Sequence, residues 1–135
     1  MKNLLTRLSA ALLLALSAAQ AEPVLAGNPA FAGQTLSGDD IKAVLLGKKV
    51  TIGDTRVVLM VAKAGDHQEA FLKQHVGMTT SQFNNHWRRL FMTGGGSAPK
   101  VVDTEDAARQ LAAETPGAVA VVDAAKAGGL AVLGK

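Results

Sequence analysis

Residues 56–62 read RVVLMVA, a run with no charge after Arg56 and with several β-branched side chains. Apolar residues fill consecutive positions here, as expected for a short strand that is covered on both faces of a sheet. Gly65 and Asp66 end this run and open a helical pattern that Gly77 closes. We therefore expect residues 56–62 to form the central strand of a layered sheet.

The rest of the chain alternates between strand and helix patterns. Residues 118–122, AVAVV, form a second run of the buried type, and weaker strand patterns lie at 24–25, 101–102 and 130–133. Residues typical of helix N-caps precede three of the helical segments: Ser37, Thr79, and Asp103 or Thr104. This alternation predicts a single α/β layered domain.

The strongest amphipathic pattern begins at Thr79, which has capping-box spacing to Gln82. One stripe of the predicted helix is apolar and aromatic, and it consists of Phe83, Trp87, Leu90 and Phe91. We expect this stripe to pack in the core, because a ring in the middle of such a stripe is more often a core residue than a ligand-stacking one.

The N-terminal segment, residues 1–21, has the features of a cleavable signal peptide. Lys2 and Arg7 give a positive start, residues 8–18 are almost entirely apolar, and AQA at 19–21 is a small-x-small cleavage pattern. The apolar run is well short of the roughly 20 residues that span a bilayer. We predict cleavage after Ala21 and a mature periplasmic domain of residues 22–135.

Composition excludes several classes of protein. Loss of Lys2 and Arg7 with the signal peptide removes two charges from the formal net charge of +3. The basic pairs 48–49 and 88–89 are isolated, so the chain lacks the basic patch that nucleic-acid binding requires. There is no cysteine, which excludes disulfides and a lipid-modified cysteine. We expect no nucleic-acid partner.

Several short motifs, taken in order, resemble the small secreted relatives of phosphate-type periplasmic substrate-binding proteins of ABC transporters. The resemblance covers roughly residues 35–123. The motifs are SGDDIKAVLLGK at 37–48, EAFLK at 69–73, QFNNHWRR at 82–89, FMTGGGSAP at 91–99 and AETPGAV at 113–119. It implies a domain like one lobe of a type II periplasmic binding protein, whose full members hold an oxyanion between two lobes.

The ligand loop of that family is altered in this chain. The relatives carry an arginine after the core strand and a Ser-Gly-Thr run four residues later, where Lys63 and residues 67–69, HQE, stand here. Phe71 matches the family's packing position. Lysine lacks the bidentate fork of arginine, and the Glu69 carboxylate would repel phosphate.

The start of the helix at Asp66 is nevertheless a candidate site for a small inorganic anion. Its free backbone amides and the charges of Lys63 and His67 would attract an anion. The candidate residues are Lys63, Gly65, Asp66, His67 and Gln68. The alternative is that Asp66 itself caps the helix and Lys63 is solvated, and we favour it because Asp is a preferred N-cap.

A glycine-rich loop is the second candidate for ligand contacts, and it comprises Thr93, Gly94, Gly95, Gly96 and Ser97. A phosphate-binding P-loop needs Gly-Lys-Ser/Thr after four further residues, but Pro99, Lys100 and Val101 stand there. A connector between two elements is the better interpretation.

No metal, cofactor or catalytic site is predicted. The three histidines, His67, His75 and His86, have spacings that suit no compact metal pair on one helix. The serines lack a glycine-elbow setting, and the acidic pairs lie in first turns of helices, where capping explains them. We therefore expect a protein that is not an enzyme.

Two functions remain open at this point. The first is a periplasmic solute-binding-like protein of the phosphate ABC transporter substrate-binding family that binds a small anion weakly. The second is an interaction module without a ligand, which docks on an envelope membrane protein, a sensor or a transporter. Its docking surface would be apolar and lie near the entry segment or the loop at Gly94. A secreted hydrolase is a distant third.

Overall fold

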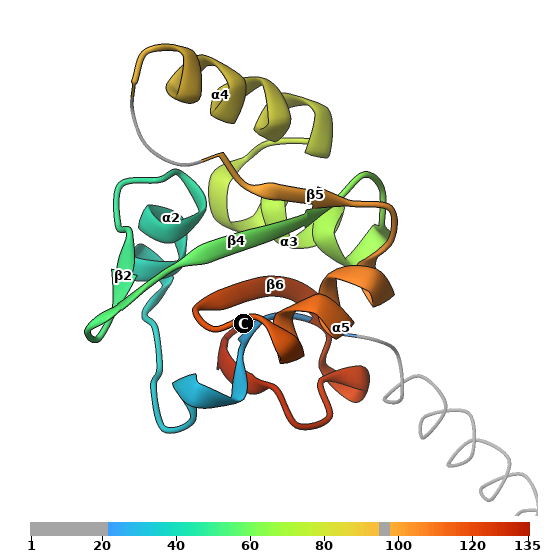
Figure 1. Ribbon diagram of the computed structural model, residues 1–135. Helices are drawn as coiled ribbons and strands as arrows, with labels where there is room; N and C mark the ends of the chain where they lie inside the picture. The colour runs from blue at the N-terminus through green and yellow to red at the C-terminus, as the bar shows by residue number, and fades with distance from the viewer. Residues whose placement is uncertain (1–21, 95–97) are drawn as a thin grey trace, which may run out of the picture.

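Five strands form one mixed sheet in the order β5-β4-β6-β1-β7, with helices on both of its faces (Figure 1). The computed structural model describes residues 22–94 and 98–135, so the predicted signal peptide lies outside the described residues. The α/β fold class is confirmed. The strands are β1 (Pro23–Gly27), β4 (Val58–Ala62), β5 (Lys100–Val102), β6 (Ala118–Asp123) and β7 (Ala131–Gly134).

The central strand of the sheet is β6, so the prediction that residues 56–62 would be central is wrong. β4 pairs in parallel with β5 on one side and with β6 on the other. β6 also pairs antiparallel with β1, which pairs antiparallel with β7. β4 is still an interior strand, buried from Leu59 to Ala62 as predicted. The weaker strand patterns at 24–25, 101–102 and 130–133 correspond to β1, β5 and β7, but the order of the strands in the sheet was not predicted.

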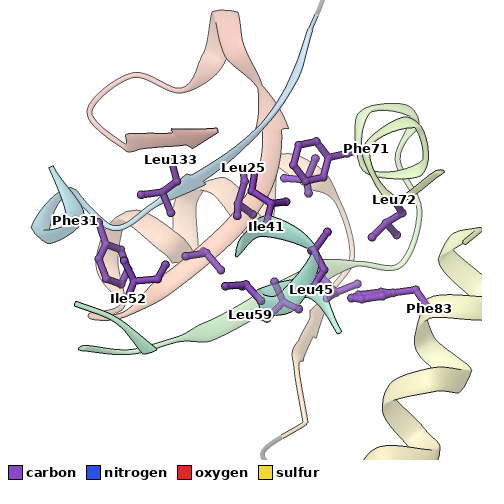
Figure 2. Packing of buried hydrophobic residues seen from close by; sticks show 14 residues of the cluster. Leu25, Phe31, Ile41, Leu45, Ile52, Leu59, Phe71, Leu72, Phe83 and Leu133 are labelled. Carbon is purple, nitrogen blue, oxygen red and sulfur yellow. The ribbon is translucent and has the colours of Figure 1, made fainter. Parts of the chain in front are cut away.

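The two faces of the sheet bury side chains of different size. Larger side chains point toward α2 and α3 and form the main core, part of which Figure 2 shows. The opposite face packs on α5 and is rich in alanine, including Ala118 and Ala120 on β6 and Ala108 and Ala112 on α5. Small residues on both sides of a contact let a helix approach a sheet closely. Alternate residues of the apolar runs in β4 and β6 point to opposite faces of the sheet, so each run contributes side chains to both cores.

In the described residues, four helices and two short 3-10 turns complete the fold, with a small hairpin beside the sheet. Ser37, Thr79 and Thr104 are N-caps, as predicted, and both hydrogen bonds of the predicted capping box at Thr79 are present. The elements are 3-10 turns Pro29–Phe31 and Ala124–Lys126, α2 (Gly38–Leu45), α3 (Asp66–Val76), α4 (Thr80–Met92), α5 (Glu105–Glu114), and hairpin strands β2 (Thr51–Ile52) and β3 (Thr55–Arg56). No helix in the described ranges is long and apolar enough to span a bilayer.

Helix α4 stands away from the sheet (Figure 1) and contacts the end of α2 through Trp87. Phe83 is buried in the main core, close to Leu45 in Figure 2. The indole Nε1 of Trp87 donates to the carbonyl of Leu45 at 2.9 Å, at the C-terminal end of α2. Phe91, by contrast, is 57% exposed. The prediction that the whole stripe is buried is therefore wrong for Phe91, because the helix continues past its contact with α2.

Gly47 lets α4 approach the end of α2, and its substitution should loosen this contact. Gly47 has φ +80°, and a Cβ there would lie 2.7 Å from Trp87 and 2.9 Å from Leu90. We expect Gly47→Ala to lower the free energy of unfolding by at least about 1 kcal/mol more than Gly77→Ala does. Gly77 is the matched control, since its φ is +66° and a Cβ there meets nothing within 4 Å.

Urea denaturation of both variants, followed by the fluorescence of Trp87, measures the difference. Trp87 is the single tryptophan of the chain, so its emission reports on this contact directly. Equal losses of unfolding free energy in the two variants would show that the positive φ accounts for the whole effect. The packing of α4 would then not depend on the absence of a Cβ at Gly47.

Candidate functional site

All five candidate anion-site residues lie at one edge of the sheet, where β4 and β5 end. The two strands are parallel, with Val61 opposite Val101, so the loops that follow them emerge at the same edge. These loops lead into α3 and α5, and the N-termini of the two helices therefore meet there. In α/β sheets this edge is where ligands usually bind.

The N-terminus of α3 is closed by Glu105, the first residue of α5. One carboxylate oxygen of Glu105 accepts from the backbone N–H of Gln68 at 2.6 Å, and the other lies 2.9 Å from Nδ1 of His67. The Glu105 side chain is 19% exposed. Gly65 makes room for it, because a Cβ at Gly65 would overlap the Glu105 side chain. An internal carboxylate thus occupies the position at which an anion would bind.

The prediction that Asp66 caps α3 is wrong. The N-cap is Gly65, which offers no side chain, and Asp66 is the exposed first residue of the helix. Capping comes instead from a carboxylate 37 residues away in sequence. From the sequence, Glu105 is a first-turn residue of its own helix, α5. Its contact with α3 could have been inferred only from the parallel pairing of β4 and β5, which places the starts of α3 and α5 side by side.

His67 lies between two carboxylates. Its Nδ1 contacts Glu105, and its Nε2 lies 3.8 Å from Oδ2 of Asp123, with only 25% of the imidazole exposed. A cavity of about 30 Å³ borders this cluster and is also lined by Arg109 and Lys126. That volume has room for one or two water molecules and none for phosphate. Neighbouring carboxylates would also oppose an added anion.

Lys63 is part of a different interaction. Its Nζ lies 3.0 Å from the carboxylate of Asp103, and both side chains are largely exposed, at 68% and 82%. An exposed pair of this kind contributes little to stability. Lys63 therefore forms a solvated ion pair across the ends of β4 and β5, close to the expectation that it is solvated.

Gln68 is a structural residue in this arrangement. Its side chain is buried, and its amide accepts from the backbone N–H of Ala62 at 2.8 Å and donates to the carbonyl of the same residue at 2.9 Å. Nε2 also reaches the hydroxyl of Thr80 at 3.4 Å. The amide group thus joins the end of β4 to the start of α4 and has no free position for a ligand.

Glu69 closes the N-terminus of α4 much as Glu105 closes that of α3. Its Oε2 accepts from the hydroxyl of Thr80 at 2.5 Å and from the backbone N–H of Thr80 at 3.0 Å. The hydroxyl bond, then the backbone bond and Lys73, hold the pKa of Glu69 below its ordinary value of 4.5. The Glu69 carboxylate therefore has a structural partner within the chain.

The lowered pKa of Glu69 predicts a pH-dependent contribution to stability. A carboxyl whose pKa is lower in the folded chain stabilises the fold above its unfolded pKa and loses this effect as pH falls through the folded pKa. We expect wild type to be more stable than Glu69→Gln above about pH 4.5, with the difference shrinking below it. Side-chain NMR titration should place the midpoint of Glu69 below 4.5, and a midpoint at or above that value would contradict the assignment.

The glycine-rich loop candidate is only partly described. Thr93 ends α4, and its hydroxyl donates to the carbonyls of Arg89 and Leu90, both at 3.0 Å. Gly94 follows with φ +77°. Gly95, Gly96 and Ser97 lie outside the described residues. The described part of the loop thus has the role of a helix end.

The described residues contain no group of three or more His, Cys, Asp and Glu side chains arranged to hold a metal ion. The remaining histidines lie in separate places. The ring of His75 packs at a tilt against Phe71 with ring centroids 4.3 Å apart, and Nε2 of His86 lies 3.1 Å from the carbonyl of Leu46. Neither histidine lies beside the cluster around His67.

A second surface feature is a groove between α4 and β5, which we call the α4–β5 groove. It encloses about 420 Å³ and is lined by Asn84, Trp87, Arg88, Phe91, Ala98, Pro99 and Val101. Phe91 and Val101 are among the most exposed large apolar residues of the described chain, at 57% and 50%. Exposed apolar surface with polar neighbours commonly marks a binding site.

The two places differ in what they offer to a ligand. The edge at α3 is filled by the chain's own carboxylate, whereas no described residue fills the largely apolar α4–β5 groove. In comparisons with known proteins, no family model and no curated protein matches this chain.

Proposed function

We propose that residues 22–135 form an exported, non-enzymatic protein related to one lobe of the phosphate-type periplasmic substrate-binding proteins. Its function is to bind an envelope membrane protein, either a transporter or a sensor. The observation that carries this proposal is the Glu105 carboxylate at the N-terminus of α3. In the resemblance described above, this is where the family would hold its anion. Here the chain supplies the anion itself, which favours binding of a protein over capture of a free solute.

Displacing Glu105 would be costly for an incoming anion. A hydrogen bond to a charged group contributes about 1.5–3 kcal/mol, and the displaced bond from the Gln68 N–H is of this kind. The displaced carboxylate and Asp123 would then face the new anion across a short distance. Phosphate would therefore have to replace the hydrogen bond between the Gln68 N–H and Glu105, and it would then lie beside the negative charges of Glu105 and Asp123.

The second candidate function is weak binding of a small inorganic anion at the residues named from the sequence: Lys63, Gly65, Asp66, His67 and Gln68. One observation favours it. The start of α3 already holds a carboxylate at 2.6 Å from a backbone N–H, so the position suits a negative group. An anion would then act by exchanging with Glu105.

A thermal-shift titration of the 22–135 protein with phosphate and sulfate separates the two candidates. An anion at 100 times its dissociation constant should stabilise the fold by about 2.7 kcal/mol, which is easily seen in the melting temperature. We expect no shift in wild type at millimolar concentrations. A specific shift that Lys63→Ala or Glu105→Gln changes would support the anion-binding candidate instead.

Partner binding is tested with the full exported chain in cells. A photoreactive residue is placed in turn at several exposed positions, such as Val50, Met92 and Val132, and the envelope fraction is examined after irradiation. We expect a discrete adduct with one membrane protein from a contiguous set of positions, and a mature N-terminus at Glu22. The absence of any adduct from every face would contradict the proposal.

A further inference from the structure

The outer edge of β5 is open for strand pairing. β5 is the first strand in the sheet order and pairs only with β4 among the described residues. The carbonyl of Val102 accepts from the N–H of Lys63 at 2.8 Å, so Val102 faces β4. Neighbouring residues of a strand alternate in direction, and the N–H and carbonyl of Val101 therefore face away from the sheet.

The open edge adjoins the α4–β5 groove. Val101 lies opposite Val61 in the register, so its side chain points to the face of the sheet on which the main core lies. There it lines the α4–β5 groove together with Trp87 and Phe91. A strand added beside β5 would hydrogen-bond to Val101 and place alternate side chains in the groove.

The charges near the groove and the free strand edge are positive. Arg88 lines the groove. Lys100 begins β5 on the opposite face of the sheet from Val101, since its register partner Met60 belongs to the second core. α4 contains no acidic residue, and no carboxylate in residues 22–94 and 98–135 forms an ion pair with Arg88 or Lys100. Unpaired cations beside an apolar groove select an acidic partner.

We propose that the free edge of β5 and the α4–β5 groove bind an extended segment of the partner protein as an additional strand, with apolar side chains in the groove and the alternating acidic ones on the opposite face, beside Lys100. This inference rests on the proposed function and specifies its partner. The groove is concave and the edge needs backbone hydrogen bonds, two features that suit a peptide segment and that a lipid surface does not use.

The opposite edge of the sheet is less available. In β7 the carbonyl of Leu133 accepts from the N–H of Leu36 at 2.8 Å, so the chain before α2 covers part of that edge. Val132 on β7 is nevertheless 46% exposed, close to the 50% of Val101. It therefore provides a matched control for apolarity without the groove.

The test uses a fluorescein-labelled peptide of nine residues in which glutamate alternates with valine, leucine or phenylalanine. Fluorescence polarisation measures its binding to the 22–135 protein. We expect saturable binding that weakens with salt. A lysine version of the peptide should not bind. N-methyl groups on the residues whose N–H groups face β5 should abolish binding of the peptide. N-methyl groups on the intervening residues, which face away from β5, should leave binding unchanged.

Substitutions locate the site. Phe91→Ser and Val101→Ser should each weaken binding about tenfold or more, as loss of an interface anchor does. Reversing Lys100 to Glu should weaken it and reduce its salt dependence. Met92→Ser and Val132→Ser remove apolar side chains that are 77% and 46% exposed outside the groove, and both should leave binding within about twofold. Circular dichroism confirms that each variant is folded.

Four results would overturn the inference. The first is that the peptide does not bind, and the second is that Phe91→Ser leaves peptide binding intact. The third is that the protein forms a concentration-dependent dimer that Phe91→Ser abolishes. The fourth is that the protein binds vesicles of equal phosphatidylglycerol and phosphatidylcholine and that Met92→Ser abolishes this binding. The cellular crosslinks keep the two proposals distinct. If crosslinked adducts form from positions outside the groove and the peptide does not bind, the proposed function stands and the proposed peptide site is wrong. If the peptide binds but no adduct forms in cells, the peptide site stands and the proposed function is contradicted.

Discussion

Replacing Gly65 with alanine is expected to lower the free energy of unfolding by about 2 kcal/mol in wild type, and by much less in a chain that already carries Glu105→Ala. The backbone of Gly65 is extended, with φ 166°, and any residue adopts that conformation. The obstacle to a Cβ at this position is the side chain of Glu105. Once Glu105 is shortened, the added methyl group has space.

A double-mutant cycle measured by urea denaturation gives the coupling energy. Glu105→Ala alone should cost about 1.5–3 kcal/mol, because the N–H of Gln68 loses a charged acceptor. The coupling between Gly65 and Glu105 should approach the cost of Gly65→Ala itself. Glu114, which is exposed near the end of α5, provides the control, and Gly65→Ala should be additive with Glu114→Ala. Additivity with Glu105→Ala as well would mean that Glu105 does not occupy the start of α3.

Gln68→Leu is expected to have the largest effect of any single substitution in this region, about 3 kcal/mol or more. Leucine has a similar volume but leaves the N–H and the carbonyl of Ala62 without the partners they now have at 2.8 and 2.9 Å. Each buried backbone group left unpaired costs about 1–3 kcal/mol. The free energy of unfolding, again from urea, measures the loss.

Gln74→Leu is the matched control, since it makes the same chemical change on the exposed side of α3. Its effect should lie within about 0.5 kcal/mol. A small effect of Gln68→Leu would indicate that water reaches the end of β4 and replaces the amide, in which case Gln68 would be free to meet a ligand.

Local sequence patterns predicted much of this fold because helix capping and apolar periodicity act over a few residues. Ser37 and Thr79 cap helices as expected, and Thr79 forms its capping box with Gln82. β1 was harder to predict, since Pro23 and Gly27 bound it and its neighbours come from the far end of the chain. Strand order depends on such distant pairings, which no local window contains.

The candidate site shows the same limit. Lys63, His67 and Gln68 were candidates for an anion site, and their partners are Asp103, Glu105 and the backbone of Ala62. Every one of these contacts depends on how β4 and β5 align or on how the helices pack behind them. The exposure of Phe91 likewise depends on where α2 ends, which the periodicity of α4 does not encode.

The strand order also determines when folding can finish. β1 lies just after the predicted cleavage site, yet Leu25 pairs with Val121 on one side and Gly134 on the other. Until β6 is available, β1 has no neighbour in the sheet, and its second neighbour, β7, comes later still. Pairings between distant parts of a chain form slowly. In a chain that crosses a membrane from its N-terminus, β1 would therefore stay unpaired until most of the chain had crossed.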